Sequence, residues 1–413
     1  MRIGAFAEKH GQSIDTIRHY MELNLIAPEK VGGQYAFDEA CDRDLDQILH
    51  FKERGFSLQE IKRVLNYQRL GKMSEHQYRC CYLDLVRYKH EGTLRRIAEL
   101  ERVRKLLEES LTALEAHRAE RQRLIGVDLA VLGVLSCTRC GGSLQLRQGQ
   151  IEDNQIVEGL LACGCGQDYP VQEGILMVPG AAEDSHEAFD IADYLNQTDS
   201  DYLDSIYKGL EWFRRRVDYC GLDHQTVLEL GCGIGFFLRY NHEELSENLS
   251  YVAVDRDLSA IRGLKDVLER SPVRRRVVFV CTDFASVPLR PGSVDVLVDH
   301  SGTSNYAFEH REFLIGKVLP LLSPVARVLG TYICFQKFSR RNPLSNEQRR
   351  WFTSRLIREE LQRLGFAVDE EARSEGITGG GPYEDFFEPG ETIYRYSLLA
   401  RRLNHGVSPM VSG

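Results

Sequence analysis

The chain has 413 residues, of which 43% are hydrophobic and 27% are charged, a composition typical of a soluble globular protein with two or three domains. No apolar run is long enough to span a bilayer, and the N-terminal string MRIGAFAEKHGQS lacks the apolar core of a signal peptide, so we expect a cytoplasmic protein without a membrane partner. The formal net charge is −9, and residues 1–70 carry 10 Lys/Arg against 11 Asp/Glu, which excludes a broadly basic surface for nucleic acid. Any DNA-binding charge in this part must lie on one face.

The first seventy residues predict four helices and one tight β-ribbon. Ser13 can cap the second helix by accepting hydrogen bonds from the amides of its first turn. Two helices joined by a glycine turn are the helix-turn-helix pattern, and the β-ribbon with Gly32-Gly33 resembles a wing. The helices are predicted over residues 3–10, 14–23, 38–53 and 57–68, and the β-ribbon over residues 31–37.

Three strings occur here in order, SIDTIRHYMELNLIAP, GGQYAFDEA and FKERGFSLQEIKRVL, and over about residues 2–70 they resemble the MerR family of bacterial transcription regulators. The resemblance implies a winged helix-turn-helix domain over residues 1–70 that binds promoter DNA, reads its shape, and acts with RNA polymerase. A small helical protein-interaction domain is the alternative.

The resemblance also implies which side chains contact DNA. Two departures from the family pattern are visible, because Asn24 stands where glycine is usual and the wing lacks its usual arginine. Arg18 and Tyr20 are expected to contact the DNA backbone, Thr16 and His19 to lie near base edges, and Tyr35 to contact DNA from the wing.

Residues 71–125 predict one long helix. The stretch contains no proline, and apolar residues recur at three- and four-residue steps with charged residues between them, which indicates a helix with one narrow apolar seam. A narrow seam needs a partner helix, so we predict a homodimer joined by a coiled coil, as the MerR resemblance also implies. Packing against the chain itself is the alternative. The seam consists of Leu100, Val103, Leu107, Leu111 and Leu114.

Four of the eleven cysteines form two close pairs, Cys137 with Cys140 and Cys163 with Cys165. Two such pairs can surround one tetrahedral Zn²⁺. Residues 144–150 and 155–163 predict the strands of a hairpin between the pairs. The string CGQDYPVQEGIL resembles the tail of the Trm112-type zinc ribbon, so residues 126–180 are predicted to form a small β zinc ribbon with a structural metal. The C-x-C spacing of the second pair leaves a metal-free ribbon as the alternative.

Residues 181–403 predict alternating strands and helices, which is typical of a parallel sheet covered by helices. The segment before the first strand begins acidic and becomes helical, and its Tyr194 and Tyr202 can belong to a lid over a pocket or to a plain packing helix. Residues 404–413 are expected to be a flexible tail. The seven strands are predicted over residues 227–230, 251–254, 277–280, 294–298, 326–334, 365–371 and 394–401.

Three motifs follow the first three of these strands, where an α/β sheet binds its cofactor. The strings VLELGCGIGFFL, YVAVDRD and CTDFASVPLRPGSVDVLVD resemble class I SAM-dependent methyltransferases over about residues 220–403. The resemblance implies contacts with the methionine portion, the ribose and the adenine of S-adenosyl-L-methionine (SAM). The residues implied for the methionine portion are Glu229, Gly231, Gly233 and Gly235. Asp255 is implied for the ribose, and Asp283 with Phe284 for the adenine.

The catalytic residues are harder to predict. Asp299 and His300 end the fourth strand, where the methyl group of the cofactor should point, and His300 is a candidate base for a hydroxyl or amine acceptor. A histidine that merely packs at the strand end is the alternative. The glycine loop 379–382 is followed by Tyr383, Phe386 and Phe387, aromatic residues that can shape an acceptor pocket.

The sequence as a whole predicts a multidomain protein. It combines an all-α winged helix-turn-helix with a long dimerisation helix, a small β zinc ribbon, and an α/β Rossmann-like seven-stranded methyltransferase. The leading hypothesis is a transcription regulator whose methyltransferase domain acts on an unknown small-molecule acceptor or effector. A regulator that uses this fold only to sense SAM or another ligand is the second hypothesis. An RNA methyltransferase is the third, and the 2 Lys/Arg against 6 Asp/Glu of residues 126–180 oppose it.

Overall fold

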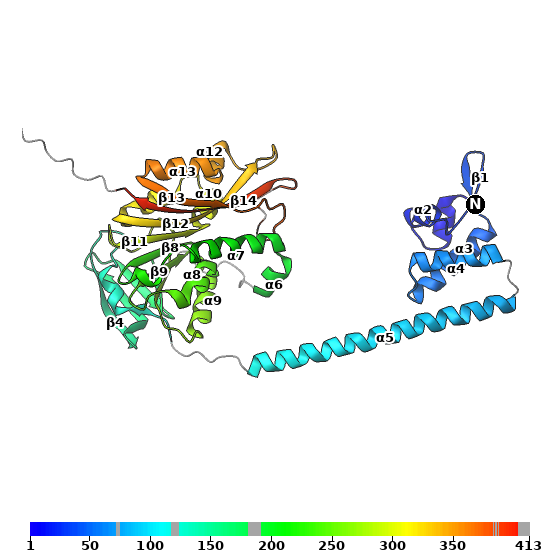
Figure 1. The fold of residues 1–413 in the computed structure, drawn as a ribbon, viewed down its shortest axis with the longest axis horizontal. Helices are drawn as coiled ribbons and strands as arrows, with labels where there is room; N and C mark the ends of the chain where they lie inside the picture. The colour runs from blue at the N-terminus through cyan, green and yellow to red at the C-terminus, as the bar shows by residue number, and fades with distance from the viewer. Residues whose placement is uncertain are drawn as a thin grey trace, which may run out of the picture. The chain divides into compact units, whose positions relative to one another are not determined.

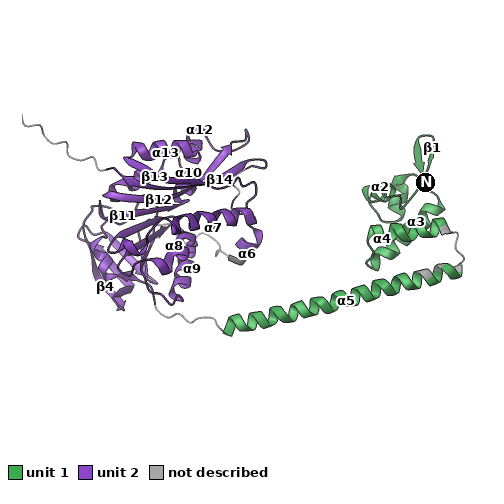
Figure 2. Ribbon diagram, viewed as in Figure 1, with its two compact units in different colours: residues 1–118 green, residues 119–413 purple. Residues whose placement is uncertain are grey.

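A computed structural model gives the fold of the chain. The chain divides into two compact units, residues 1–118 and residues 119–413 (Figure 2). No helix among the described residues is both long and apolar enough to cross a membrane. The predicted tail, the acidic segment 181–190, Tyr383 and Phe387 lie outside the described residues. The structure describes residues 1–71, 75–116, 124–180, 191–382, 384, 386 and 388–403.

The first unit contains the predicted helices and the predicted β-ribbon (Figure 1). The two strands pair antiparallel, with Val31 opposite Gln34. The elements are α1 (Ile3–Lys9), α2 (Ile14–Glu22), β1 (Glu29–Val31), β2 (Gln34–Ala36), α3 (Glu39–Glu53), α4 (Leu58–Gly71) and α5 (Glu75–Ala116).

One apolar core joins α1 to α4, and Phe6, Ile17 and Tyr20 are buried in it. Ser13 caps α2 as predicted, because its Oγ accepts a hydrogen bond from the Thr16 amide at 3.0 Å. The turn after α2 places Asn24 at φ +55°, in the left-handed region that asparagine tolerates better than most residues. The replacement of the usual glycine by Asn24 is therefore compatible with the fold.

Helix α5 has 42 residues and is roughly 63 Å long at about 1.5 Å per residue. Its first half is fixed to the core of the unit, since Tyr82 and Leu85 pack against that core and Lys89 Nζ lies 3.0 Å from Glu60 Oε2. The predicted seam in its second half is exposed, with Leu107 60% and Leu114 71% accessible.

The second unit is built on one sheet of twelve described strands. Its strands follow the order β13-β14-β12-β11-β8-β9-β10-β7-β6-β5-β3, and β4 pairs with β5 outside this path. The strands are β3 (Val127–Asp128), β4 (Leu144–Glu152), β5 (Gln155–Cys163), β6 (Asp168–Gln172), β7 (Ile175–Met177), β8 (Thr226–Leu230), β9 (Ser250–Asp255), β10 (Arg276–Cys281), β11 (Val294–His300), β12 (Leu322–Lys337), β13 (Phe366–Arg373) and β14 (Thr392–Arg402).

All seven strands predicted after residue 220 are present, as β8 to β14. Strands β8 to β12 run parallel, whereas β14 lies antiparallel between β12 and β13. The strand order changes direction between β8 and β11, so the crevice at their carboxyl ends is the expected ligand site of a doubly wound sheet. The helices that bear on this crevice are α6 (Ile191–Gln197), α7 (Ser200–Arg214), α8 (Phe236–Asn241), α9 (Leu258–Glu269) and α10 (Gly302–Glu309).

The predicted ribbon hairpin is also present, as β4 and β5. Its turn residues Asp153 and Asn154 have φ +47° and +66°, the left-handed pair that a two-residue hairpin favours. The ribbon does not stand apart, because β7 pairs parallel with β10 and places Leu176 opposite Val280. The predicted domain boundary at residue 180 therefore lies inside one compact unit.

Candidate functional site

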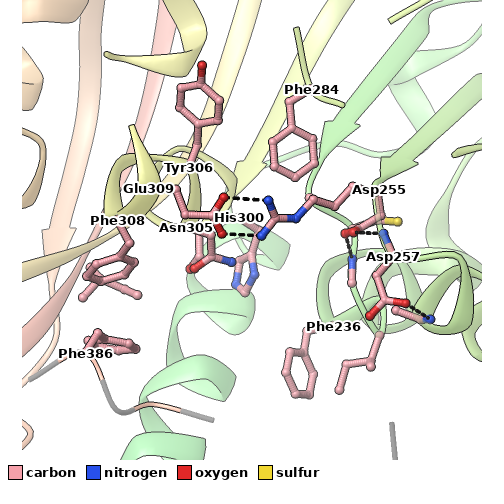
Figure 3. A pocket seen from close by; sticks show the side chains of 18 of the residues that line it. Phe236, Asp255, Asp257, Phe284, His300, Asn305, Tyr306, Phe308, Glu309 and Phe386 are labelled. Carbon is pink, nitrogen blue, oxygen red and sulfur yellow. Dashed lines mark hydrogen bonds and ion pairs between the residues drawn. The ribbon is translucent and has the colours of Figure 1, made fainter. Parts of the chain in front are cut away.

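A pocket of about 1030 Å³ lies at the carboxyl ends of β8, β9, β10 and β11 (Figure 3). Its wall contains six of the seven residues predicted to contact the cofactor, and His300 as well. Gly235 and Asp299 are not part of the wall. The six are Glu229, Gly231, Gly233, Asp255, Asp283 and Phe284.

The glycine loop after β8 is held by the end of β9. Asp255 Oδ2 accepts a hydrogen bond from the Gly233 amide at 2.7 Å, and the Gly231 amide donates to the Val254 carbonyl at 2.9 Å. Gly235 has φ +79°, and a Cβ there would lie 2.2 Å from the Leu264 side chain. Gly235 thus permits the chain to lie close to Leu264 of α9 just before α8 begins, while Gly231 and Gly233 line the pocket.

Two buried carboxyl groups lie in the wall beside the glycine loop. Glu229 is 1% exposed and accepts from the Tyr251 hydroxyl at 2.8 Å. Burial, with a smaller effect of Asp255, raises the pKa of Glu229 to about 8 against the opposing effect of Tyr251. Burial also raises the pKa of Asp255, although amide donors including Asp257 counteract it. A cationic ligand group would favour the ionised form of either residue.

Another part of the pocket wall is aromatic and polar. Phe284 is largely buried, and a Cβ on Gly231 would lie 3.4 Å from its ring. Arg256 Nη1 donates to Glu309 Oε2 at 2.6 Å, an ion pair drawn dashed in Figure 3. Asp283 is exposed and accepts from a backbone amide in its own turn. A ring face, a carboxylate and an ion pair suit a flat polar heterocycle.

The structure separates the two predicted catalytic residues. His300 lies in the pocket wall, and its Nε2 has no hydrogen-bond partner among the described residues. Burial and the charge of Arg395 lower the pKa of His300 to about 3, so its ring is neutral. Asp299 is fully buried behind the wall, where its Oδ1 accepts from the Thr303 amide at 2.7 Å and burial raises its pKa to about 6. Asp299 holds the start of α10.

Part of the pocket comes from residues that the sequence motifs did not indicate. Arg395 of β14 and Asn305 of α10 line it, together with Tyr202, Tyr194 and Phe386. Of these, Phe386 is a predicted candidate for the acceptor pocket, whereas the sequence leaves Tyr194 and Tyr202 open between a lid over a pocket and a plain packing helix. The available signal for Arg395 was an arginine near the start of the predicted strand YRYSLLAR, whose other arginine, Arg401, stands at its end.

The four cysteines of the ribbon form a cluster that can hold a metal ion, with all four sulfurs within 4.8 Å of one another. Cys137 Sγ lies 3.7 Å from Cys165 Sγ, and Cys140 Sγ lies 3.4 Å from Cys163 Sγ. Zinc–sulfur bonds of about 2.3 Å would place tetrahedral sulfurs about 3.8 Å apart. The shorter C-x-C spacing therefore still places the sulfurs of Cys163 and Cys165 where they can bind the same metal ion as those of Cys137 and Cys140.

The residues predicted to contact DNA are divided between surface and core. Arg18 and His19 are exposed on α2, and Thr16 is half-buried beside its cap. Tyr20 is 1% exposed, and its hydroxyl accepts from Lys52 Nζ at 3.1 Å, so the ring belongs to the core.

The wing carries a cation that the sequence motifs did not indicate. Tyr35 is 43% exposed on β2, and Lys30 Nζ of β1 lies 5.2 Å from the centre of its ring. Lys30 thus offers a positive charge in a wing that lacks the usual arginine.

Comparisons with known proteins agree with these two units. The model of the MerR HTH family regulatory proteins matches residues 1–68, and the methyltransferase domain model matches residues 227–324. The mercuric resistance operon regulatory protein of Bacillus cereus is 34% identical over 110 residues, which cover 26% of this chain and 79% of that protein. The HTH-type transcriptional activator mta of Bacillus subtilis is 41% identical over 63 residues, 15% of this chain and 24% of its own length.

Similar solved structures include SAM-dependent methyltransferases. One from Aquifex aeolicus is 16% identical and covers 52% of this chain and 100% of its own, with a TM-score of 0.35. Another from Methanosarcina mazei is 17% identical and covers 44% of this chain and 94% of its own, with a TM-score of 0.32. The chain belongs to the MerR family of transcription regulators, and residues 227–324 of its second unit match a methyltransferase domain.

Proposed function

We propose that this regulator binds SAM in its second unit and transfers the methyl group to a small molecule. The observation that carries the proposal is the extent of the pocket, which continues past the cofactor residues to Tyr202, His300 and Arg395. Its volume of about 1030 Å³ reaches the upper end of the range of about 300–1,000 Å³ of small-molecule sites. Such a pocket has room for a cofactor and a small acceptor together.

The residues present fit the cofactor. Gly231 has φ +69°, which glycine adopts readily, and a Cβ there would lie 3.2 Å from the Gly302 Cα, while Asp255 offers carboxylate oxygens at the pocket wall. SAM supplies an electrophilic methyl group on a positively charged sulfur. The protein has to hold the acceptor in line with that methyl group. We assign this orientation to the neutral ring of His300 through its Nε2, which has no partner among the described residues, and we assign to Asp299 the positioning of the adjacent helix α10.

The first test is a calorimetric titration of SAM into the full chain and into Asp255→Ala, with Asp369→Ala as an exposed control on β13. We expect binding to the wild type and the control, and a loss of at least tenfold in affinity for Asp255→Ala. The absence of binding to the wild type would refute the proposal. Binding without formation of S-adenosylhomocysteine from any acceptor in cell extract would instead favour the SAM-sensing regulator.

We propose further that α5 joins two chains into a homodimer that binds promoter DNA and acts with RNA polymerase. The support is the exposed seam of α5, where Leu100, Leu107 and Leu114 are each more than half accessible. Sedimentation should show a dimer for the full chain and a monomer for a fragment ending at residue 71. A dimeric fragment would show that α5 is not the dimer element.

We propose that the cysteine cluster holds a structural Zn²⁺. The converging sulfurs support four-coordinate binding, and the Tyr169 hydroxyl donates to Cys137 Sγ at 3.2 Å, the kind of outer contact that orients metal ligands. Elemental analysis of protein purified without added metal should give one zinc per chain.

A further inference from the structure

The guanidinium of Arg395 is a buried charge in the pocket wall. Arg395 is 4% exposed, and its Cζ lies 4.8 Å from the centre of the Tyr202 ring. Its Nε donates to Ser205 Oγ at 3.0 Å, and its Nη1 donates to Ser301 Oγ at 3.2 Å. Both acceptors are neutral hydroxyls.

Arg395 makes no ion pair among the described residues. A buried cation without a counter-charge is strongly disfavoured, so such groups are usually paired or face a ligand that pairs with them. The carboxyl group of Glu384, also in the wall, already accepts from the Tyr194 hydroxyl at 3.1 Å and from the Gly381 amide at 2.8 Å. Burial raises the pKa of Glu384 against the lowering effects of Tyr194, the Gly381 amide and the charge of Arg395, and no hydrogen bond or ion pair among the described residues joins Glu384 to Arg395.

Two further groups beside Arg395 have the geometry of a prepared site. Ser301 has φ +69°, a left-handed conformation that is strained for serine, and it places the hydroxyl that accepts from Arg395. The neighbouring His300 also lines the pocket and keeps Nε2 without a partner among the described side chains. A cation, a hydroxyl and an imidazole therefore meet at one end of the pocket.

We propose that the methyl acceptor is an acid, whose carboxylate or phosphate oxygens pair with Arg395. This inference rests on the proposed methyl transfer, because it names the substrate class of the same site. A planar guanidinium binds either oxyanion with two parallel hydrogen bonds. The rings of Tyr194, Tyr202 and Phe386 also line the pocket and suit an apolar or aromatic body of the acceptor.

The test uses the full chain and four probes of one shape: phenylacetate, phenyl phosphate, the neutral phenylacetamide and the cationic phenethylamine. Their affinities are measured by ligand-observed NMR, with and without S-adenosylhomocysteine. We expect at least one anionic probe to bind at least ten times more tightly than both phenylacetamide and phenethylamine. The ratio of the two anionic probes tells a carboxylate site from a phosphate site.

Variants localise the effect. Arg395→Gln should remove the preference for anions, Arg395→Lys should keep part of it, and Arg373→Gln is the matched control. Arg373 is an exposed arginine that lies over the Tyr394 ring on the same sheet, outside the pocket. The ratios of the probe affinities are measured on the wild-type chain alone. The proposal can therefore be refuted even if Arg395→Gln folds poorly.

Equal binding of acid and amide, a preference for phenethylamine, no binding of any probe, or an unchanged preference in folded Arg395→Gln would each overturn the proposal. A preference for phenethylamine would assign the site to an amine beside Glu384. A separate titration of S-adenosylhomocysteine keeps the two ideas apart. If S-adenosylhomocysteine does not bind, the proposed methyl transfer is refuted. The preference for anionic probes is measured without S-adenosylhomocysteine as well, so it is judged separately.

Discussion

Replacing Gly235 by alanine should destabilise the second unit more than the same change at Gly233. Both residues have positive φ, +79° and +49°, which makes alanine unfavourable by about 1–2 kcal/mol at either position. Only at Gly235 would the new Cβ also meet a neighbour, 2.2 Å from Cδ1 and 2.9 Å from Cγ of the buried Leu264. Such overpacking adds about 1–3 kcal/mol, so we expect about 2–5 kcal/mol at Gly235.

Thermal unfolding followed by tryptophan fluorescence measures this difference. Both tryptophans, Trp212 and Trp351, belong to the second unit, so the signal is blind to the winged unit. At about 2–4 °C per kcal/mol, Gly235→Ala should lower Tm by roughly 4–20 °C and Gly233→Ala by roughly 2–8 °C. Gly233→Ala should instead weaken SAM binding, because Gly233 lines the pocket. Equal losses of Tm in the two variants would refute the packing role of Gly235.

Three further predictions concern DNA, metal and pH. Arg18→Ala should weaken binding to DNA duplexes of any sequence and reduce the dependence of log K on log salt concentration by about 1, as measured by fluorescence anisotropy. Arg43→Ala, which changes an exposed arginine on α3, should leave the binding unchanged. Identical binding curves for Arg18→Ala and the wild type would exclude docking through α2. A strong chelator should remove one zinc per chain and lower Tm, because the ribbon strand β7 pairs with β10, and metal-free protein with the same Tm would contradict this. Glu229 titrates at about 8 when folded and at about 4.3 when unfolded, so its burial costs stability as pH rises through that interval. Urea unfolding should therefore show Glu229→Gln gaining a few kcal/mol over the wild type at pH 8 and little at pH 4, and an equal gap at both pH values would disprove the buried ionisation.

The strands, and the position of most predicted cofactor residues at one pocket, could be predicted from the sequence because their signals are local. The strings after residue 220 alternate apolar runs with turns, and the motif residues end those runs, so parallel strands bring Glu229, Asp255 and Phe284 to one edge. The hairpin of the ribbon and the helices of the first unit were predictable for the same reason. Asn24 was visible as a departure, and its left-handed backbone explains it.

The remaining features depend on contacts between distant parts of the chain. Arg395 reaches the pocket only because β14 inserts antiparallel between β12 and β13, which no short motif encodes. Tyr20 lies on the same helix as Arg18, and only the packing of α2 against the core decides that the ring is buried. Asp299 and His300 are neighbours in sequence, but alternate side chains of a strand point to opposite faces, so only His300 lines the pocket.

The parallel pairing of β7 with β10 also determines where this protein can be recombined. An engineer who wished to give the winged unit a new effector would be tempted to cut after the ribbon, near residue 180. That cut would leave the β10 edge unpaired in one fragment and the β7 edge unpaired in the other, and exposed strand edges invite aggregation. A junction between residues 116 and 124 keeps the whole sheet together. The cysteine ribbon and the methyltransferase domain should therefore be moved between proteins as one segment.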